Sequence, residues 1–580
     1  MPVQVTGGLV EGVPSAVDAG ITVYRGIPYA APPVGRNRFR APQAVVPWSG
    51  VRLCDTTGPQ CPQLAPDPKY PNILEGVPQS EDCLYLNMHV PASSSASATA
   101  KMAKCPVFVW LHGGMFREGG SADPHYDGTG LAQQGVIVVV PVFRLGALGF
   151  LAHPVLSQEN AENTENATTG SASSGNMGIL DALQVLQWVH DNIAQFGGDP
   201  GRVTVGGQSS GAAMAHVLLL SPRTRGLLHG VALHSGVRSY REPSLANAAP
   251  SYRLLRDAEA DGEALLHELG TSIDELRRDD CMVPLESILR LALRKDTRMW
   301  GPPPLFRAVL DGDVFPQPYS ATMSGAAGPP NDVPVLTGQN AAEGGVYNEP
   351  RFTAEDLRDC VEARLGPHGN GNGSEAWVRR YFDVYGDHSD SDMDMDDPTA
   401  AADIQGNAAL ATWNRSARDC TRLNIALWAQ EYHTHTTSPV FGYYFTHAPP
   451  PWHGWTPDFS LPKVPGYTHA KGPLFGAHHN AEMSYAFNSM AGGQNRLRPW
   501  TDADYQMGNT MATLWANFCK YGNPNGKDGN GRPEGLPQWP SLTEQPDVLM
   551  QLGGNFEPVL VAGSKAKAFW TEYIQGQKAW

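Results

Sequence analysis

The stretch VTVGGQSSGAAMAHV, residues 203–217, begins as a β-branched run, stops at glycines around a serine and continues in helix-forming residues. This order predicts a strand, a sharp turn and a helix. In that context a G-x-S-x-G match indicates a nucleophile elbow, because glycines occupy positions where Cβ atoms would collide and the serine hydroxyl projects above the sheet. Ser209 is therefore the candidate nucleophile. An ordinary Gly/Ser turn is the alternative as long as the pentapeptide stands alone.

Two nearly continuous apolar runs, at 107–111 and 136–140, precede this turn. Runs that do not alternate with polar residues are typical of parallel strands covered on both faces. The first run ends in His112-Gly113-Gly114-Met115-Phe116. An HGGG-type loop at this place supplies backbone amides to the oxyanion hole of lipases and esterases. A tight turn without a catalytic role is the alternative.

The other elements alternate along the chain and predict a large α/β domain. Strands are expected at 231–233, 333–337 and 440–445, and helices at 179–196, within the charged region 251–296 and around 511–518. Short apolar runs separated by Gly/Pro turns predict a small antiparallel sheet between residue 3 and about residue 46. We see no linker that divides the 580 residues, so we expect one domain spanning 1–580.

A carboxylate and a histidine complete a possible triad. Glu343 lies in the turn GQNAAEG after the strand expected at 333–337, although a single loop glutamate is usually only solvated. His479 lies in GAHHNAEM, residues 476–483. Ser209, Glu343 and His479 follow one another in the chain order of α/β-hydrolases, whereas two other well-known serine triads have different orders.

Composition excludes several classes of protein. Apolar residues make up 41% of the chain, with 14 Trp and 19 Tyr, which is enough for a buried core. No apolar run approaches the ~18 residues of a membrane span. The net charge of -16 argues against nucleic acid or an anionic membrane surface as a partner. We therefore expect a soluble globular protein, and if it is an enzyme its acidic charge could still steer cationic substrates.

Metal and cofactor sites are not expected. Eight cysteines without a C-x-x-C pair suggest neither zinc nor a disulfide scaffold. Aspartates at 390, 392, 394, 396 and 397 lack the glycine and final glutamate of a calcium loop, so a solvated loop is expected there.

Only weak sequence signals indicate the cellular compartment of the protein. Strand-like sequence starts near Val3 without a preceding signal region, so either a signal has been removed or the protein is intracellular. Sequons at Asn166, Asn372 and Asn414 are compatible with secretion, but chance occurrence explains them nearly as well. Secretion is the expectation, with the cytoplasm as the alternative.

Nearly the whole chain resembles the type-B carboxylesterase family, which includes cholinesterases. The segments that carry the resemblance are GIPYAAPPVG, RFRAP, SEDCLYLN, VFVWLHGG, FRLGALGFLAHP, GNMGILDALQVLQWVHDNIAQFGGDP, VTVGGQSSGA, PVLTGQNAAEG and GAHHNAEMSYAF. The resemblance implies an α/β-hydrolase fold: a large, mostly parallel central sheet with helices on both faces and a small N-terminal antiparallel sheet.

The resemblance also assigns roles. It implies Ser209 as nucleophile, Glu343 as the acid that orients the imidazole, and His479 as base. His478 is only the neighbour, because the family places its histidine three residues before a glutamate, here Glu482. The implied oxyanion donors are the backbone amides of Gly114, Met115 and Ser210. The family further implies a Cys61–Cys83 disulfide and the structural ion pairs Arg38–Glu81 and Arg144–Asp181.

This sequence departs from the family at several positions. Gln208 stands where the family usually has Glu, Ser210 where it usually has Ala, and Met115 where it has a third glycine. The Met115 side chain is expected to narrow the acyl side. Loss of the charge at residue 208 is expected to lower the pKa of His479 relative to a Glu-bearing relative. The acid turn also lacks the family's Asp before Glu343.

No tryptophan lies between Cys61 and Cys83, so the aromatic side chain that holds the choline ammonium in cholinesterases is missing. We expect an esterase acting on small to medium uncharged esters through an acyl-enzyme, without a cofactor. The alternatives are an amidase, or a specialised hydrolase of an ester-bearing natural product or toxin. A non-enzymatic alternative is a cholinesterase-like binding or adhesion protein. The presence of all three triad residues argues against this alternative. The protein could be a monomer or a dimer.

Overall fold

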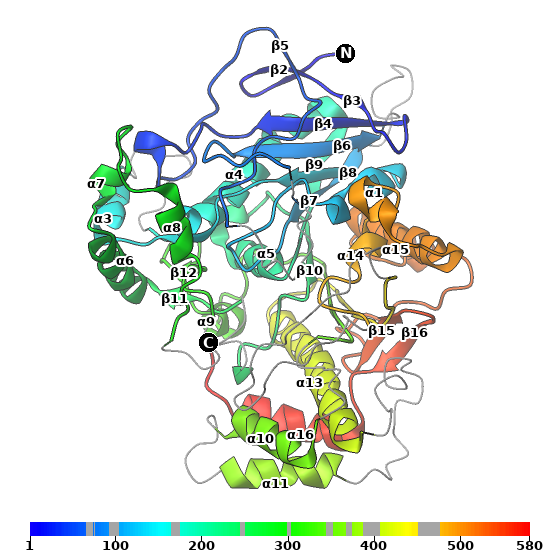
Figure 1. The fold of residues 1–580 in the computed structure, drawn as a ribbon. Coiled ribbons are helices and arrows are strands. Elements are labelled where there is room, and N and C mark those ends of the chain that lie inside the picture. Colours follow the sequence, from blue (N-terminus) through cyan, green and yellow to red (C-terminus); the bar gives the residue numbers. More distant parts are fainter. Residues whose placement is uncertain are drawn as a thin grey trace.

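The computed structural model describes residues 1–64, 74, 76–91, 104–163, 174–243, 250–297, 303–343, 352–366, 374–386, 407–450 and 476–580. Within these residues, eleven strands form one twisted sheet that runs through the middle of the molecule (Figure 1). Across the sheet the strands are β16 (Phe556–Leu560), β15 (Val548–Leu552), β14 (Val440–Phe445), β13 (Val335–Asn340), β10 (Gly230–His234), β9 (Gly198–Gln208), β7 (Cys105–Leu111), β8 (Ile137–Pro141), β6 (Tyr85–Pro91), β4 (Ile21–Pro28) and β3 (Val13–Pro14).

The centre of this sheet is parallel and its edges are antiparallel. Neighbouring strands from β15 to β8 pair in parallel, whereas β16 and the three strands β6, β4 and β3 pair antiparallel. The central strands are buried along most of their lengths, as their unbroken apolar runs predict. Parallel strands end at the same edge of a sheet, so the loops after β7, β9, β10 and β13 meet there.

Helices cover both faces of the sheet, as predicted. Helix α5 (Ser210–Leu220) packs on β7, β9 and β10 and contacts α4 (Met177–Asn192). Helix α15 (Asp502–Tyr521) also contacts β7 and β9 and packs with α1 (Thr129–Gln133), which contacts β6 and β8. The helix predicted over 179–196 consists of α4 and a 3-10 turn, Ile193–Phe196, and ends at Gly197 with φ 78°.

The N-terminal sheet is smaller and less regular than predicted. It contains β1 (Val3–Val5), β2 (Gly8–Glu11) and β5 (Val51–Leu53), with β1 antiparallel and β5 parallel to β2. Strands β3 and β4, which the sequence pattern assigned to it, extend the central sheet instead. The physical reason is that β4 has a buried apolar set, including Ile21, Val23 and Ile27, which pairing with β6 keeps in the core.

The remaining described α-helices are α2 (Gly146–Phe150), α3 (Pro154–Asn163), α6 (Leu255–Leu269), α7 (Ile273–Leu276), α8 (Leu285–Leu291), α9 (Tyr319–Ser324), α10 (Ala354–Leu365), α11 (Ser374–Tyr385), α13 (Ala408–His433), α14 (Met483–Ala486) and α16 (Ser564–Gln575). Among them, α3, α6, α7 and α8 lie together on one side of the molecule, α10, α11, α13 and α16 lie at the end away from β4, and α14 packs beside α15 (Figure 1). Strands β11 (Arg253–Leu254) and β12 (Val309–Leu310) form a separate parallel pair. None of the helices in these ranges is long and apolar enough to cross a bilayer.

Both ion pairs implied by the resemblance are present. Arg38 binds Glu81 through two hydrogen bonds of 2.7 and 2.6 Å. Arg144 binds Asp181 in the same bidentate way at 2.8 and 2.6 Å, and both side chains are buried. Each pair joins segments that are far apart in the sequence, as the structural role expected of it requires.

The implied disulfide is absent. Cys61 and Cys83 are free, fully buried thiols in this structure. A sulfur contact from Cys61, together with burial, raises the pKa of the Cys83 thiol well above its ordinary value. The two thiols therefore lie next to each other, where the resemblance places the disulfide, and no bond joins them in this structure.

One of the three sequons lies in the described part of the chain, and the predicted compartment stays a prediction. Asn414 is completely buried in α13, so that sequon is closed to a glycosyl group in the folded chain. Asn166, Asn372 and the aspartates at 390–397 lie outside the described residues.

Candidate active site

Ser209 lies between strand β9 and helix α5, as the predicted elbow requires. Its φ of 56° and ψ of -121° fit neither element, and a residue with a Cβ held in such a sparsely populated region costs about 1–3 kcal/mol. The Ser209 amide donates to the His234 carbonyl at 2.9 Å. A Cβ on Gly207 or on Gly211 would collide with backbone atoms of Gly211 or Leu111. Both glycines of the motif are therefore required, and the strand–turn–helix prediction is confirmed.

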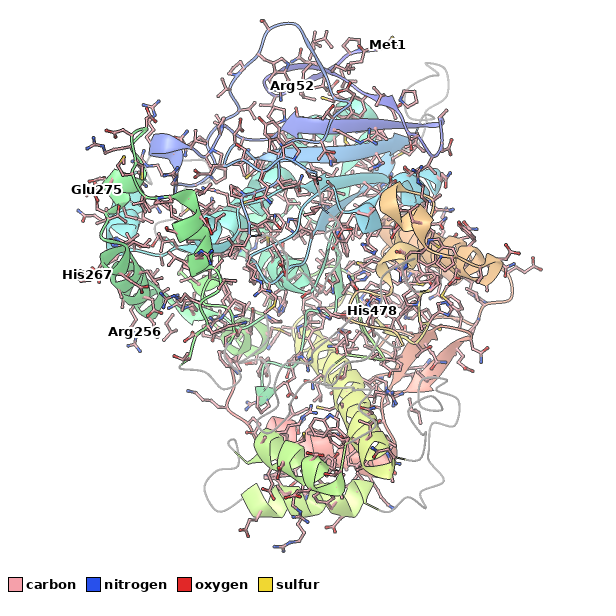
Figure 2. The ribbon with its side chains drawn as sticks, in the orientation of Figure 1. Met1, Arg52, Arg256, His267, Glu275 and His478 are labelled. Atoms are coloured by element: carbon pink, nitrogen blue, oxygen red, sulfur yellow. The ribbon has the colours of Figure 1, made fainter. Side chains whose placement is uncertain are left out.

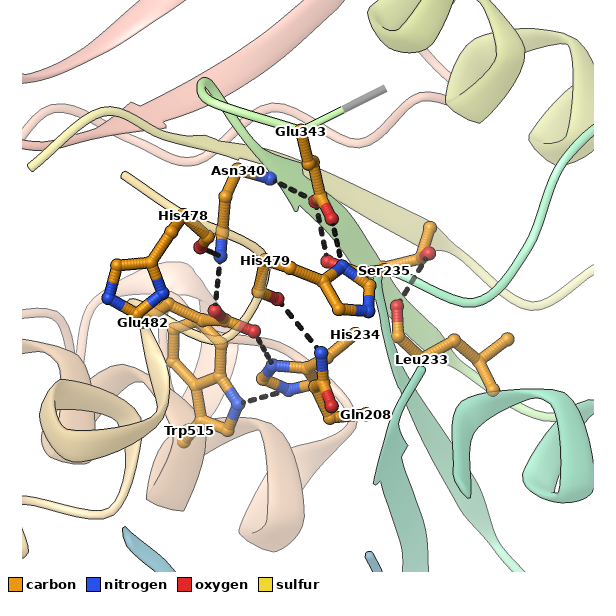
Figure 3. Close-up of polar contacts among 11 residues, drawn as sticks. Gln208, Leu233, His234, Ser235, Asn340, Glu343, His478, His479, Glu482 and Trp515 are labelled. Atoms are coloured by element: carbon orange, nitrogen blue, oxygen red, sulfur yellow. Dashed lines mark hydrogen bonds and ion pairs between the residues drawn. The ribbon is translucent and has the colours of Figure 1, made fainter. Parts of the chain in front are cut away.

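Glu343 and His479 form a hydrogen-bonded pair beyond the carboxyl ends of β10 and β13 (Figure 3). Glu343 Oε2 contacts His479 Nδ1, and Glu343 Oε1 accepts from the Ser235 hydroxyl at 2.7 Å and the Asn340 amide at 2.6 Å. The carboxylate thus has a fixed orientation. Because the Glu343 carboxylate accepts a hydrogen bond from Nδ1–H of His479, Nε2 is the nitrogen of the ring that can act as a base.

The pKa of His479 is raised above its ordinary value of 6.5. Burial lowers it, but the charge of Glu343, the hydrogen bond to Glu343 and the charge of Glu482 together outweigh burial and a smaller effect of Arg238. About half of the His479 side chain (52%) is exposed, although the protein around the ring still acts to lower its pKa. A raised pKa makes the ring a stronger base once it is deprotonated.

Gln208 connects the elbow to the loop of residues 476–482 that carries His479, here called the histidine loop. Its side-chain amide donates to the main-chain carbonyl of His479 at 2.8 Å (Figure 3). The contact seen here is therefore with the backbone of His479, and the expected effect of residue 208 on the pKa of the imidazole stays a prediction. No hydrogen bond joins Ser209 Oγ to His479 among the described residues. Catalytic hydrogen bonds commonly tighten only when substrate binds, so the separation is compatible with their proposed roles.

The loop after β7 lies directly against the elbow. A Cβ on Gly113 would come within 2.6 Å of Gln208 Oε1 and 3.3 Å of Ser209 Cβ. Within the described chain, the backbone amides of Gly114, Met115 and Ser210 donate to no protein acceptor. Ser210 is the first residue of α5, where the positive end of the helix dipole favours negative charge. These are the properties that an oxyanion site needs.

A second, fully buried network supports the histidine loop and was missed in the sequence. Glu482 accepts from Asn340 Nδ2 at 2.5 Å and contacts His234 Nδ1 at 3.2 Å, while Trp515 Nε1 donates to His234 Nε2 at 3.0 Å (Figure 3). His234 therefore accepts at Nε2 and donates from Nδ1 to Glu482. Asn340 also donates to the His478 carbonyl at 2.6 Å.

His478 itself is turned away from the triad. Burial lowers its pKa to about 3, so it remains neutral and serves no role as a base near neutral pH. Figure 2 shows His478 near the middle of the molecule, whereas Arg256, His267 and Glu275 of α6 and α7 lie at the outer edge. Of the two histidines, His479 is the one that contacts Glu343 among the described residues.

Position within the sheet was the sequence signal that could have revealed Ser235 and Asn340. Ser235 follows the last residue of β10, and Asn340 is the last residue of β13. Functional side chains gather at the carboxyl ends of parallel strands, so both positions were candidates.

Comparison with known proteins then decides the family: a model described as the carboxylesterase family matches residues 1–570. The chain belongs to the carboxylesterase family. It is therefore a serine hydrolase of carboxylic esters with the α/β-hydrolase fold, and the type-B resemblance seen in its motifs is confirmed.

Relatives of this esterase include enzymes with different substrates. It is 31% identical to the fumonisin B1 esterase of Sphingopyxis macrogoltabida, over 89% of this chain and 81% of the relative. It is 30% identical to the human cocaine esterase, over 98% of this chain and 90% of the relative. A solved structure of a PNB esterase superimposes with a TM-score of 0.68 at 26% identity, covering 98% and 99% of the two chains.

Proposed function

We propose that this esterase cleaves its substrate with Ser209 as nucleophile, His479 as base and Glu343 as the orienting acid. The observation that carries the proposal is the Glu343–His479 pair, held at the sheet edge beside the Ser209 elbow. Three backbone amides next to that serine, which have no protein acceptor within the described ranges, supply the oxyanion site. These groups lie on separate loops, so their meeting at one edge has a catalytic rather than a local structural explanation.

The steps follow from the groups in place. His479 Nε2 takes the proton of Ser209, whose oxygen attacks the ester carbonyl, and the negative oxygen rests on the amides of Gly114, Met115 and Ser210. The tetrahedral species collapses, the C–O bond breaks and His479 returns the proton to the departing alcohol. Water then attacks the acyl-enzyme by the same route, which releases the carboxylic acid and restores Ser209.

An active-site label tests the assignment. An organophosphate should inactivate the protein and add its mass to the peptide that contains Ser209. Ser209→Ala should lose hydrolysis of p-nitrophenyl esters by a factor of about 10³ or more. Ser221→Ala is the matched control, because Ser221 is a buried serine at the other end of α5 and should leave the rate unchanged. Undiminished hydrolysis by Ser209→Ala would refute the assignment.

A specialised natural-product esterase is the second candidate function. It is favoured by the similarity to the fumonisin B1 esterase, which extends over 89% of this chain. This candidate predicts that fumonisin B1 is hydrolysed with a higher kcat/KM than p-nitrophenyl butyrate, with both activities lost in Ser209→Ala. Product formation is followed by mass spectrometry. Hydrolysis of the butyrate alone would leave the general esterase as the function.

A further inference from the structure

The loop after β7, residues 112–116, carries two of the proposed oxyanion donors and is here called the oxyanion loop. It contains two consecutive residues in a backbone conformation that favours glycine. Met115 has φ 56° and Phe116 has φ 59°. Residues with a Cβ rarely adopt this region, and two in succession need support from their surroundings. The amide of Met115 is one of the proposed oxyanion donors, so whatever holds this turn also aims that amide.

The support comes from the helix that carries the nucleophile. The Phe116 amide donates to Ser210 Oγ at 3.3 Å, and the Phe116 carbonyl accepts from the Gly146 amide at 2.6 Å. The Phe116 ring packs on Phe150 with ring centres 4.9 Å apart. Phe116 and Ser210 are each 2% exposed, so water has little access to the hydrogen bond between them. The Ser210 hydroxyl therefore ties the first turn of α5 to the residue after Met115.

We propose that the Ser210 hydroxyl is a positioning group for the oxyanion site, and that it compensates for methionine at residue 115. The inference rests on the proposed function. Alanine at 210 would leave the buried Phe116 amide without its acceptor, which frees the turn to leave the left-handed region. Glycine at 115 would hold the same backbone conformation without help, because it has no Cβ. The two residues are therefore energetically coupled through the loop.

A double-mutant cycle tests the coupling. Ser210→Ala should lower kcat about 10-fold, less than the loss from deleting an oxyanion donor, with KM changed less than about 2-fold. Affinity for a trifluoromethyl ketone, which forms a tetrahedral adduct on the serine, should fall by the same factor as kcat/KM. In the Met115→Gly background, Ser210→Ala should cost less than about 2-fold. Rates are normalised to the fraction of protein labelled by an organophosphate, so that misfolded protein does not contribute.

Ser221→Ala is again the matched control. Ser221 Oγ accepts the Arg223 amide at 3.4 Å, so the variant loses the same kind of bond from a buried serine at the end of α5. It should leave kcat and ketone affinity unchanged. Equal losses from Ser210→Ala in the parent chain and in the Met115→Gly variant would overturn the coupling, as would a loss seen in KM alone. If Ser209→Ala abolishes activity while Ser210→Ala has no effect, this inference fails and the proposed function stands.

Discussion

Among the described residues, the Gln208 side chain donates one neutral hydrogen bond. Its side-chain nitrogen lies 2.8 Å from the His479 carbonyl oxygen, and the side chain is buried. A carboxylate at this position would bring two oxygen acceptors together with no proton between them. Charge at residue 208 would therefore first disturb the histidine loop, and only secondarily the pKa of the imidazole.

Gln208→Glu should accordingly lower kcat at neutral pH by about 10-fold or more, the cost of an unpaired buried acceptor. Gln208→Met, which has a similar shape and no charge, should lose less. Both are measured as kcat and KM on one neutral ester. A different result would show that residue 208 reaches the imidazole: a Gln208→Glu variant with full activity, a higher pKa on the acidic limb of its kcat/KM profile, and improved hydrolysis of cationic esters.

Met115 is half-buried on the oxyanion loop, and its side chain is the obstacle expected on the acyl side. Met115→Gly should shift preference from acetyl toward longer acyl groups in a series of p-nitrophenyl esters. Glycine also relieves the strain of φ 56°, so we expect unfolding stability to stay equal or rise by up to about 1 kcal/mol. An unchanged acyl-chain profile would mean that Met115 lies outside the pocket.

At the scale of elements, a buried ion pair joins α4 to the loop after β8. Arg144 and Asp181 are 3% and 0% exposed. Asp181→Asn would leave a buried guanidinium with only neutral partners, which typically costs about 3–5 kcal/mol. Urea unfolding measures the loss. Asp191→Asn changes an exposed aspartate of the same helix and should have almost no effect; a comparable loss there would point to a general sensitivity of α4.

The turn after β13 controls the basicity of His479. Burial lowers the pKa of His479 and the Glu343 charge raises it, with the net value above 6.5. The base is lost as pH falls through that pKa, so the acidic limb of kcat/KM should have its midpoint above pH 6.5. Glu343→Gln removes the main raising influence, so its limb should move to lower pH while kcat falls. An unmoved limb would assign the titration to another group.

For the whole molecule, buried histidines link stability to pH. Burial lowers the pKa of His216 to about 3 and that of His112 to about 4, well below the ordinary 6.5. The unfolded chain takes up these protons below pH 6.5 and the folded chain does not, so their contribution to stability is complete above pH 6.5 and is lost as pH falls. As pH falls from 6.5 toward the lowered pKa of the folded state, each histidine reduces the free energy of unfolding by about 1.4 kcal/mol per pH unit.

His216→Gln should therefore reduce the slope of unfolding free energy against pH between 6 and 5 by about 1 kcal/mol per unit. Glutamine offers an oxygen to the Trp428 indole, which now donates to His216 Nε2 at 3.2 Å. Urea unfolding at pH 7, 6 and 5 provides the slopes. His190→Gln, at an exposed position on α4, is the control. Identical slopes for His216→Gln and the parent chain would contradict the linkage.

The sequence alone determined the parts of this protein that depend on near neighbours. The elbow around Ser209 could be predicted because Gly207 and Gly211 are required by contacts within one turn and with the adjacent strand. Uninterrupted apolar runs indicated the central strands, and the chain order of Ser209, Glu343 and His479 indicated the triad that we propose. Each signal is local or concerns order, so a single chain displays it.

Only the tertiary structure decided which side chains hold these groups in place. Gln208 bonds a carbonyl 271 residues away, Ser235 a carboxylate 108 residues away, and Ser210 accepts an amide 94 residues away. The direction of such contacts depends on the register of β9, β10 and β13 and on how their loops pack, which no local pattern records. The same limit explains β4, whose apolar residues could serve either sheet until the packing of the whole core placed it beside β6.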